Sequence, residues 1–222
     1  MDLMQAFETR HSVRTYLDTP IPGDIVSQLQ EEIDNCNREG NLNIQLITEE
    51  PEAFDSFMAH YGKFTGVKNY IALIGTKSDD LSERCGYYGE RLVIKAQMLG
   101  LNSCWVALTF SKRKAKYTVG KGEKMVCVIA LGYGENPGKP HINRSIDKLT
   151  DFRGDMPHWF MDGVMLAMKA PTARNQQKFC FRLEGENKVH AFSQGGAYSD
   201  VDLGIVKYHF EVGAGKENFE YV

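Results

Sequence analysis

The sequence predicts an α+β layer fold. Apolar runs typical of strands and amphipathic segments typical of helices both occur, and they mix without the strict alternation of a doubly wound α/β fold. The chain has 222 residues, of which 42% are hydrophobic and 25% charged. This is ordinary globular composition, and the length allows one domain or two small ones around a substantial core.

Charge and cysteine usage limit the functional classes. A net charge of −3 gives no general electrostatic footprint for nucleic acid or for an anionic membrane. The chain opens with no basic-then-apolar leader, and no apolar run approaches the roughly 18 residues of a membrane span. The odd number of widely spread cysteines, with no C-x-x-C pair, predicts reduced thiols. We therefore expect a soluble cytoplasmic protein that binds neither nucleic acid nor membrane.

The first half of the chain shows both kinds of pattern. Ile25, Leu29 and Ile33 recur at helical spacing after Asp24, a plausible N-cap, whereas Tyr70 to Gly75 is a continuous apolar run typical of a central strand. Gly100 is a good C-terminal cap for the clearest helix. The expected elements are one or two helical turns over 3–7, helices over 24–36, 51–64 and 87–100, strands over 42–47, 70–75 and 125–131, a loop over 101–108, and a turn-rich basic loop over 135–144.

The second half repeats the same order of elements. We expect a helix over 159–168, a turn over 170–176, two strands over 179–183 and 189–192 joined by a turn at 185–187, and a helix over 198–212. Helix, strand, strand and helix therefore occur in 24–100 and again in 157–213. Residue identity between the two copies is poor, so the pattern fits either an internal repeat or the ordinary order of an α+β protein.

The pentapeptide Arg10-His11-Ser12-Val13-Arg14 is the first candidate site. Two guanidinium groups and a hydroxyl can converge on one phosphate, and arginine suits this role because its donors are planar and bidentate. The alternative is a solvated basic turn, since such short motifs also recur by accident.

The stretch from Ala170 to Gln177 is the second candidate site. It offers a hydroxyl and three primary amides, and such amides can match the alternating acceptors and donor on the pyrimidine edge of a flavin. The alternative is a turn that merely precedes a strand.

Other catalytic and binding motifs are absent from the sequence. The Gly132-Tyr133-Gly134 stretch lacks the third glycine of a dinucleotide-binding fingerprint, and Gly120-Lys121-Gly122 lacks the first glycine of a P-loop. The six histidines show no metal-ligand spacing, and no Ser/His/Asp or Cys/His arrangement can be identified. We therefore expect no metal and no catalytic side chain, so that the reactive chemistry of an enzyme would belong to a cofactor.

Four stretches together resemble the nitroreductase family of FMN-dependent oxidoreductases: 10–14, 87–105, 130–134 and 170–177. The resemblance covers most of the chain and implies mainly antiparallel sheets flanked by helices. Members of this family usually carry their Pro-Ser-x-x-Asn-x-Gln element soon after the arginine motif, whereas here Pro-Thr-x-x-Asn-x-Gln lies in the second half. That order looks like the branch in which one chain carries two half-domains that mimic the family homodimer.

This resemblance implies a division of labour between two halves. Residues 1–145 would grip the FMN phosphate, and residues 146–222 would cover the flavin ring. We expect one FMN per chain, in a monomer that acts as a pseudo-dimer and that can associate further.

The resemblance also implies a set of cofactor-binding residues. Arg10 and Ser12 would hold the phosphate and ribityl chain, and Arg14 would approach the pyrimidine. Backbone contacts would come from His11 and from the segment containing Trp105 and Val106, and Lys139, His141 and Arg144 would close on the phosphate. From the pseudo-partner, the ring would be met by Pro171, Thr172, Ala173, Asn175 and Gln177.

The implied activity is transfer of hydride from NADH or NADPH through FMN to nitroaromatic, quinone-like or related small electron-poor acceptors. The alternatives are another flavin-dependent reaction on the same fold and an FMN-binding sensor or carrier without turnover.

Overall fold

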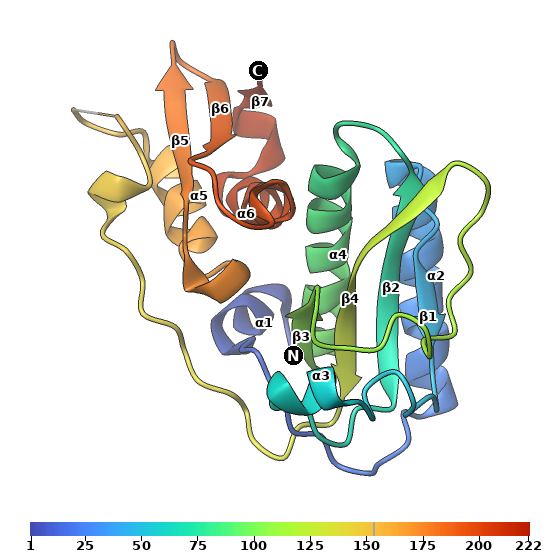
Figure 1. Cartoon of the computed structure of the whole chain (residues 1–222). Coiled ribbons are helices and arrows are strands. Elements are labelled where there is room, and N and C mark those ends of the chain that lie inside the picture. Colours follow the sequence, from blue (N-terminus) through green and yellow to red (C-terminus); the bar gives the residue numbers. More distant parts are fainter. Residues whose placement is uncertain (153) are drawn as a thin grey trace. The chain divides into compact units, whose positions relative to one another are not determined.

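The computed structural model describes residues 1–152 and 154–222 (Figure 1). The chain divides into two compact units. Unit 1 comprises Met1–Leu81 and Arg91–Pro140, and unit 2 comprises Ser82–Glu90 and His141–Val222. The long helix α4 (Leu81–Met98) contributes residues to both units.

Unit 1 is built on a four-stranded antiparallel sheet in the order β1-β2-β4-β3. The strands are β1 (Gln45–Ile47), β2 (Asn69–Thr76), β3 (Asn102–Val106) and β4 (Glu123–Gly132). Every residue of β2 except the last is buried, which explains its continuous apolar sequence. Because β3 is an edge strand, one of its sides is open to pairing with another segment.

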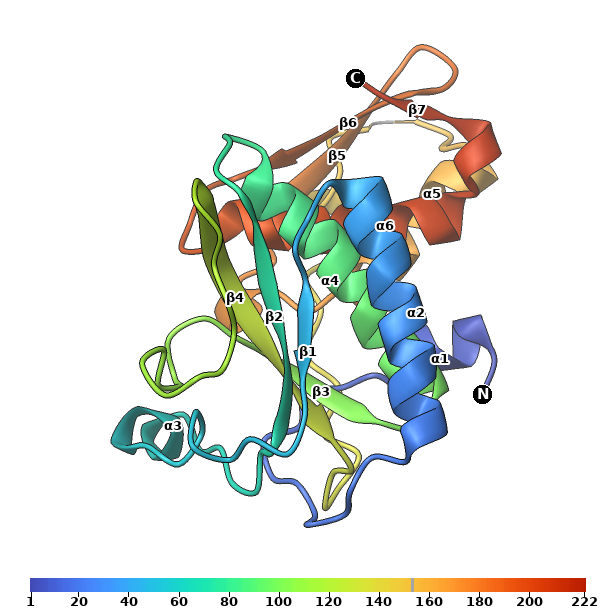
Figure 2. The same cartoon turned by 90° about the vertical axis from the view of Figure 1, so that its right-hand side faces the viewer.

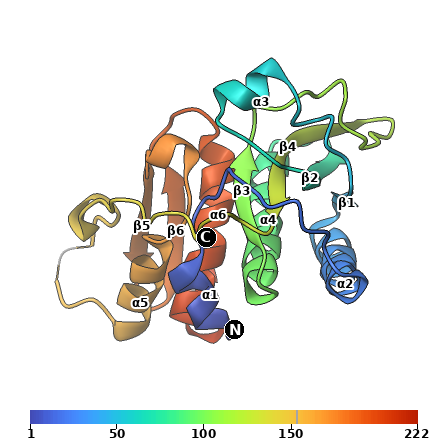
Figure 3. The same ribbon diagram turned by 90° about the horizontal axis from the view of Figure 1, so that it is seen from below.

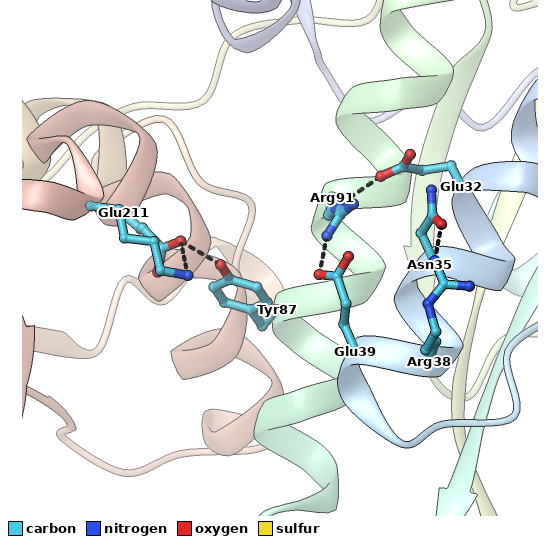
Figure 4. Close-up of polar contacts among 8 residues, drawn as sticks. Glu32, Asn35, Arg38, Glu39, Tyr87, Arg91 and Glu211 are labelled. Carbon is cyan, nitrogen blue, oxygen red and sulfur yellow. Dashed lines mark hydrogen bonds and ion pairs between the residues drawn. The ribbon is translucent and has the colours of Figure 1, made fainter.

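The helices of unit 1 are α1 (Leu3–Thr9), α2 (Gly23–Gly40), the short α3 (Phe57–Tyr61) and the second half of α4. Figure 2 shows α2 and α4 running beside one another along the sheet. Arg91 of α4 joins the two helices, because its guanidinium donates to Glu32 at 2.5 Å and to Glu39 at 2.6 Å (Figure 4).

Unit 2 combines two helices with a small sheet. Figure 3 shows α5 (His158–Ala167) and α6 (Ser199–Ala214) side by side. The antiparallel hairpin of β5 (Phe179–Glu184) and β6 (Lys188–Ser193) is extended by β7 (Glu220–Tyr221), which runs parallel to β6. Aromatic rings fill the core, and Phe181 and Phe210 stack with their centroids 4.3 Å apart.

Within unit 2, the first half of α4 crosses α6 at two glycines. A Cβ atom added to Gly204 would lie 1.9 Å from the Glu83 carbonyl oxygen, and one added to Gly86 would lie 2.1 Å from the Val201 carbonyl oxygen. Only glycine allows these backbones to approach so closely. Beside this crossing, Tyr87 of α4 donates its hydroxyl to Glu211 of α6 at 2.8 Å (Figure 4).

A buried polar pair also joins the helices of unit 2. His209 and Glu90 are both fully buried, and His209 Nε2 lies 2.9 Å from Glu90 Oε1. His209 Nδ1 lies 3.0 Å from the Leu166 carbonyl oxygen and donates to it, while Nε2 on the other side of the ring makes the hydrogen bond with Glu90. The pair therefore ties α4, α5 and α6 together at one point.

The predicted α+β class with antiparallel strands is confirmed, and so are the main strands and the second-half hairpin. Helix, strand, strand and helix occur in both halves, as α2-β1-β2-α4 and α5-β5-β6-α6, although the first copy also contains α3. Gly100 comes two residues after Met98, the last residue of α4, and its φ of +84° suits the predicted capping role.

Several predicted boundaries are wrong. Residues 102–106 form β3 rather than a loop, because Ser103, Cys104 and Val106 are buried against the neighbouring strand. The helix predicted over 51–64 is reduced to α3, because the Glu50 carboxylate accepts from the backbone N–H groups just after it and holds them in a turn. Asp24 does not cap α2, which begins at Gly23 after Pro22, and α4 begins at Leu81 rather than at residue 87.

Among the residues that the structure describes, no helix combines the length and the apolar character needed to cross a membrane.

Candidate functional site

The arginine motif follows α1 and pairs with the open edge of β3. Arg10 ends the helix with extended dihedral angles, and Val13 N–H donates to the Ser103 carbonyl at 3.0 Å. Ser12 and Ser103 form a parallel bridge in the same pairing. Alternation then directs Val13 into the core and leaves Ser12 and Arg14 exposed, while Arg10 is only 4% exposed.

The side chains of this motif gather around Cys104 of β3. Burial raises the pKa of the Cys104 thiol, whereas the positive charges of Arg14 and Arg10 and a hydrogen bond with Ser12 oppose the rise. Arg14 also places its Cζ 5.8 Å from the centre of the Phe64 ring, within cation–π range. The structure thus brings the two guanidinium groups and the hydroxyl of the sequence motif within interaction range of the same thiol.

The loop that follows β4 lies directly against this motif. Gly138 has φ +77°, and a Cβ there would lie 2.7 Å from His11 Cβ and 3.1 Å from the Ser12 carbonyl oxygen. Lys139 comes next in the chain and is exposed. On β3, Trp105 is half-buried and Val106 is buried in the core, which suits backbone contacts by Val106. We call the predicted site residues of unit 1 the N-terminal cluster: Arg10, His11, Ser12, Arg14, Trp105, Val106 and Lys139.

The second predicted stretch adopts a strained backbone in unit 2. Arg174, Asn175 and Gln177 all have φ between +45° and +54°, in the left-handed region that is uncommon for residues other than glycine. The Thr172 hydroxyl accepts from the Gln177 N–H at 3.0 Å and helps to hold this conformation. Strain of this kind persists only where surrounding contacts over-determine it, and it clusters at functional sites.

Residues 141–144 supply part of that support. The Ile142 carbonyl accepts from the side-chain amides of Asn175 at 3.0 Å and Gln177 at 2.8 Å, and Arg144 N–H donates to Gln177 Oε1 at 2.8 Å. His141 Nε2 lies 2.9 Å from the Met168 carbonyl oxygen and donates to it. Gln177 is 2% exposed, so its carboxamide orders the segment in this conformation.

Residues 141–144 and residues 170–177, which were predicted as separate stretches, are therefore joined by hydrogen bonds into one structural feature. Pro171, Thr172 and Ala173 are half-buried, whereas Asn175 and Arg144 are exposed. We call the predicted site residues of unit 2 the C-terminal cluster: His141, Arg144, Pro171, Thr172, Ala173, Asn175 and Gln177.

Asp202 holds the C-terminal cluster in place, although no sequence motif selected it as a site residue. Its carboxylate accepts from Ala173 N–H at 2.9 and 3.1 Å and from Gln176 Nε2 at 2.7 Å. Burial raises the pKa of Asp202 to about 6, although the bonds from Gln176 and Ala173 oppose this rise. The only local signal was an acidic residue in the first turn of a helix, which ordinarily indicates interaction with the helix dipole.

The two clusters offer different ligand chemistry. The N-terminal cluster combines guanidinium, hydroxyl and backbone groups, which are the donors that phosphate prefers. The C-terminal cluster combines a hydroxyl with neutral amides on a fixed backbone. Among the described residues, no group of three or more His, Cys, Asp or Glu side chains is arranged to hold a metal ion.

A family model described as "Putative TM nitroreductase" matches residues 2–214, which is nearly the whole chain. The chain belongs to this nitroreductase family. No curated protein matches the sequence.

Solved structures of nitroreductases share the fold. A "putative nitroreductase" from Thermotoga maritima MSB8 has 21% identity and a TM-score of 0.68, over 98% of this chain and 85% of that chain. A "putative nitroreductase in complex with FMN" from Desulfovibrio desulfuricans has 15% identity and a TM-score of 0.55, over 71% of this chain and 99% of that one. A nitroreductase family protein from Streptococcus pneumoniae TIGR4 has 12% identity and a TM-score of 0.53, over 68% and 100%. These similarities confirm that the chain has the nitroreductase fold, with helices packed on an antiparallel sheet.

Proposed function

We propose that this nitroreductase is an FMN-dependent oxidoreductase that transfers hydride from NADH or NADPH to small electron-poor acceptors such as nitroaromatics or quinones. The N-terminal cluster is the observation that carries the proposal, because its two arginines and Ser12 gather at one sheet edge beside the Gly138 loop. Family membership and the FMN-bound relative from D. desulfuricans support the choice of cofactor.

In this proposal, the N-terminal cluster holds the phosphate and ribityl chain. Arg10 and Ser12 donate to phosphate oxygens, because a phosphate removed from water needs several donors. His11, Trp105 and Val106 contribute backbone contacts. Lys139, His141 and Arg144 add positive charge or donors near the phosphate. Arg14 lies toward the pyrimidine, where a positive charge favours the reduced, anionic ring.

The C-terminal cluster meets the ring in this proposal. Pro171 packs on the ring, while Thr172, Ala173 and Asn175 contribute polar or backbone contacts to its edge, and Gln177 holds the segment in shape. Residues 1–145 and 146–222 then act as two halves of a pseudo-dimer with one FMN per chain. The same order of helix, strand, strand and helix in both halves supports this division. When bound, FMN supplies the redox chemistry, so no side chain need exchange a proton with the acceptor.

Anaerobic reduction tests the proposal. The protein purified or reconstituted with FMN is expected to be yellow, to bind one FMN per chain, and to bleach on addition of NADH or NADPH. Reoxidation by a nitroaromatic or quinone should then restore the colour. A yellow protein that neither nicotinamide bleaches would be a flavin carrier rather than an oxidoreductase. A colourless protein that takes up no FMN contradicts both functions, and two FMN per chain contradicts the pseudo-dimer.

A further inference from the structure

A run of positive charge lies outside both clusters, in the loop between β3 and β4. Within five residues of unit 1 it carries Lys112, Arg113, Lys114 and Lys116. Among the described residues, no carboxylate lies within ion-pair distance of any of these four, although Lys68, Arg182 and Lys207 are each paired with an acidic side chain. Four unneutralised cations in a protein of net charge −3 are a local anion-attracting surface.

The backbone beneath these charges is firmly held. Ser111 N–H donates to the Ala53 carbonyl at 2.7 Å, and Lys116 N–H donates to the Tyr70 hydroxyl at 2.8 Å. That hydroxyl in turn donates to the buried Glu50 carboxylate at 2.9 Å. The exposed cationic side chains of this loop therefore extend from an ordered frame.

Two exposed aromatic rings lie beside the charges on the short helix α3. Phe57 is 82% exposed and Tyr61 76% exposed, and a spacing of four residues puts them on one face of the helix. The segment that carries α3 packs on the basic loop, because Lys114 Nζ donates to the Asp55 carbonyl at 3.3 Å and the Phe54 and Phe110 rings stack at 6.0 Å. We call Lys112, Arg113, Lys114, Lys116, Phe57 and Tyr61 the basic–aromatic surface.

This surface adjoins the N-terminal cluster within unit 1. Thr65 N–H donates to the Arg14 carbonyl at 3.0 Å, and Phe64, three residues after α3, lies under the Arg14 guanidinium. A Cβ on Gly62 would lie 2.6 Å from the Thr109 side chain, just beyond the end of β3. The N-terminal cluster and the basic–aromatic surface are therefore neighbours in unit 1.

We propose that the basic–aromatic surface binds the adenosine 2′-phosphate end of NADPH, so that NADPH is preferred over NADH as the hydride donor. This inference rests on the proposed function. The 2′-phosphate is the group that distinguishes the two donors, and lysine and arginine side chains bind it directly, arginine in bidentate fashion. Phe57 and Tyr61 provide flat faces for the adenine ring. The Asp55 carboxylate of the same segment lies 3.9 Å from the His60 imidazole.

A charge-removal variant with a matched control tests the inference. K112Q/R113Q/K116Q removes three exposed charges and leaves the Lys114 contact in place. K77Q/K121Q/K124Q removes three exposed charges that also lack an ion pair among the described residues, but away from the basic run: Lys121 is at the far end of the loop, Lys124 is in β4, and Lys77 follows β2 and donates its N–H to the Gly122 carbonyl. In the FMN-loaded enzyme, the first variant should raise KM for NADPH about tenfold with KM for NADH and kcat unchanged. The second should change neither KM more than about twofold.

The aromatic residues of the surface should affect KM for both nicotinamides. Phe57→Ala should raise KM for NADPH and NADH by the same few-fold factor, because adenine is common to both. Wild-type enzyme that uses NADH as well as NADPH overturns the inference, as does an equal rise for both donors in K112Q/R113Q/K116Q.

Direct binding separates this inference from the proposed function. Adenosine 2′,5′-bisphosphate should bind the wild-type protein at least tenfold more tightly than 5′-AMP or adenosine 3′,5′-bisphosphate, and K112Q/R113Q/K116Q should abolish that preference. If neither nicotinamide reduces the flavin, the proposed function fails while this titration still decides the phosphate site. Equal binding of the three nucleotides overturns the site, and tighter binding of the 3′-phosphate assigns it to a different nucleotide and overturns it as well.

Discussion

The two clusters of predicted site residues are held in opposite ways. In unit 1, the segment from Arg10 to Arg14 is extended and pairs with β3 through ordinary backbone hydrogen bonds, and its polar side chains carry the charge. In unit 2, the segment from Thr172 to Gln177 has three residues in the left-handed region, and a set of side-chain contacts holds it.

The difference shows where each cluster is vulnerable. The shape of the N-terminal cluster comes from backbone pairing at a sheet edge, so an exposed side chain such as that of Arg14 can be removed there with its ligand contact and little else. The shape of the C-terminal cluster comes from Asp202, Ile142 and Thr172, so a change at Asp202, which has no ligand contact in the proposal, should disturb the whole segment.

The largest expected effect is on flavin binding by the N-terminal cluster. Arg10→Ala should weaken FMN affinity between tenfold and a hundredfold, since a charge-assisted hydrogen bond contributes about 1.5–3 kcal/mol. FMN titration, followed by the quenching of flavin fluorescence, measures the change. Arg174→Ala is the matched control, because Arg174 is an exposed arginine within the strained segment of unit 2, and it should alter affinity less than twofold. Unchanged affinity in Arg10→Ala would remove this residue from the phosphate site.

Local sequence patterns were sufficient where burial is uniform. The strands β2 and β4 were predicted because each contains a continuous apolar run, buried over 69–75 in β2 and over 127–132 in β4, and the hairpin of β5 and β6 because a turn at 185–187 separates two strand-like segments. The strand β3 was missed because it is an edge strand of five residues in which polar and apolar residues mix. The first turns of α4 were missed because they pack on α6 through Gly86, a contact with residues more than 100 positions away.

The residues of the candidate site also fall into two groups, those that short motifs predicted and those whose roles depend on distant contacts. Short motifs were enough to select Arg10, Ser12 and Arg14, and the structure gathers these three around one thiol. The stretch 170–177 was selected by its amides, but its strained backbone and its support from Ile142 have no local signature. Asp202 could not be predicted, because its role depends on a contact with a segment 29 residues away.

The next largest expected effect is a pH dependence of the unfolding free energy that arises from Asp202, the residue that supports the C-terminal cluster. The pKa of Asp202 in the folded protein, about 6, is raised above its ordinary value of 3.8 by burial. The folded state therefore binds this proton more tightly than the unfolded state, and stability from this group is present at low pH and lost as pH rises through 6. Asp202→Asn removes the titration. The unfolding free energy of wild type minus that of the variant should fall by about 2 kcal/mol between pH 4.5 and 7.5.

Urea unfolding of both proteins at several pH values in that range checks this sign. Asp200→Asn is the control, since Asp200 is an exposed acidic residue in the same first turn of α6. If the wild-type unfolding free energy minus that of Asp202→Asn stays constant or rises with pH, burial does not destabilise the ionised form of Asp202.

The smallest expected effect is that of Thr172→Ala. It tests whether the C-terminal cluster depends on a fixed backbone, whereas the N-terminal cluster depends on charge. Thr172→Ala removes the oxygen that accepts from the Gln177 N–H, and leaving that group of a buried residue unsatisfied should lower stability by about 1 kcal/mol and FMN affinity a few-fold. Thr172→Ser keeps the hydroxyl and should restore both. Because this loss arises from backbone geometry, it should be equal at low and high salt, whereas the loss in Arg14→Ala should shrink as salt screens the exposed guanidinium from the anionic flavin. FMN titrations of both variants at two ionic strengths measure the contrast, and a salt-dependent loss in Thr172→Ala would mean that charge, rather than a fixed backbone, also governs the C-terminal cluster.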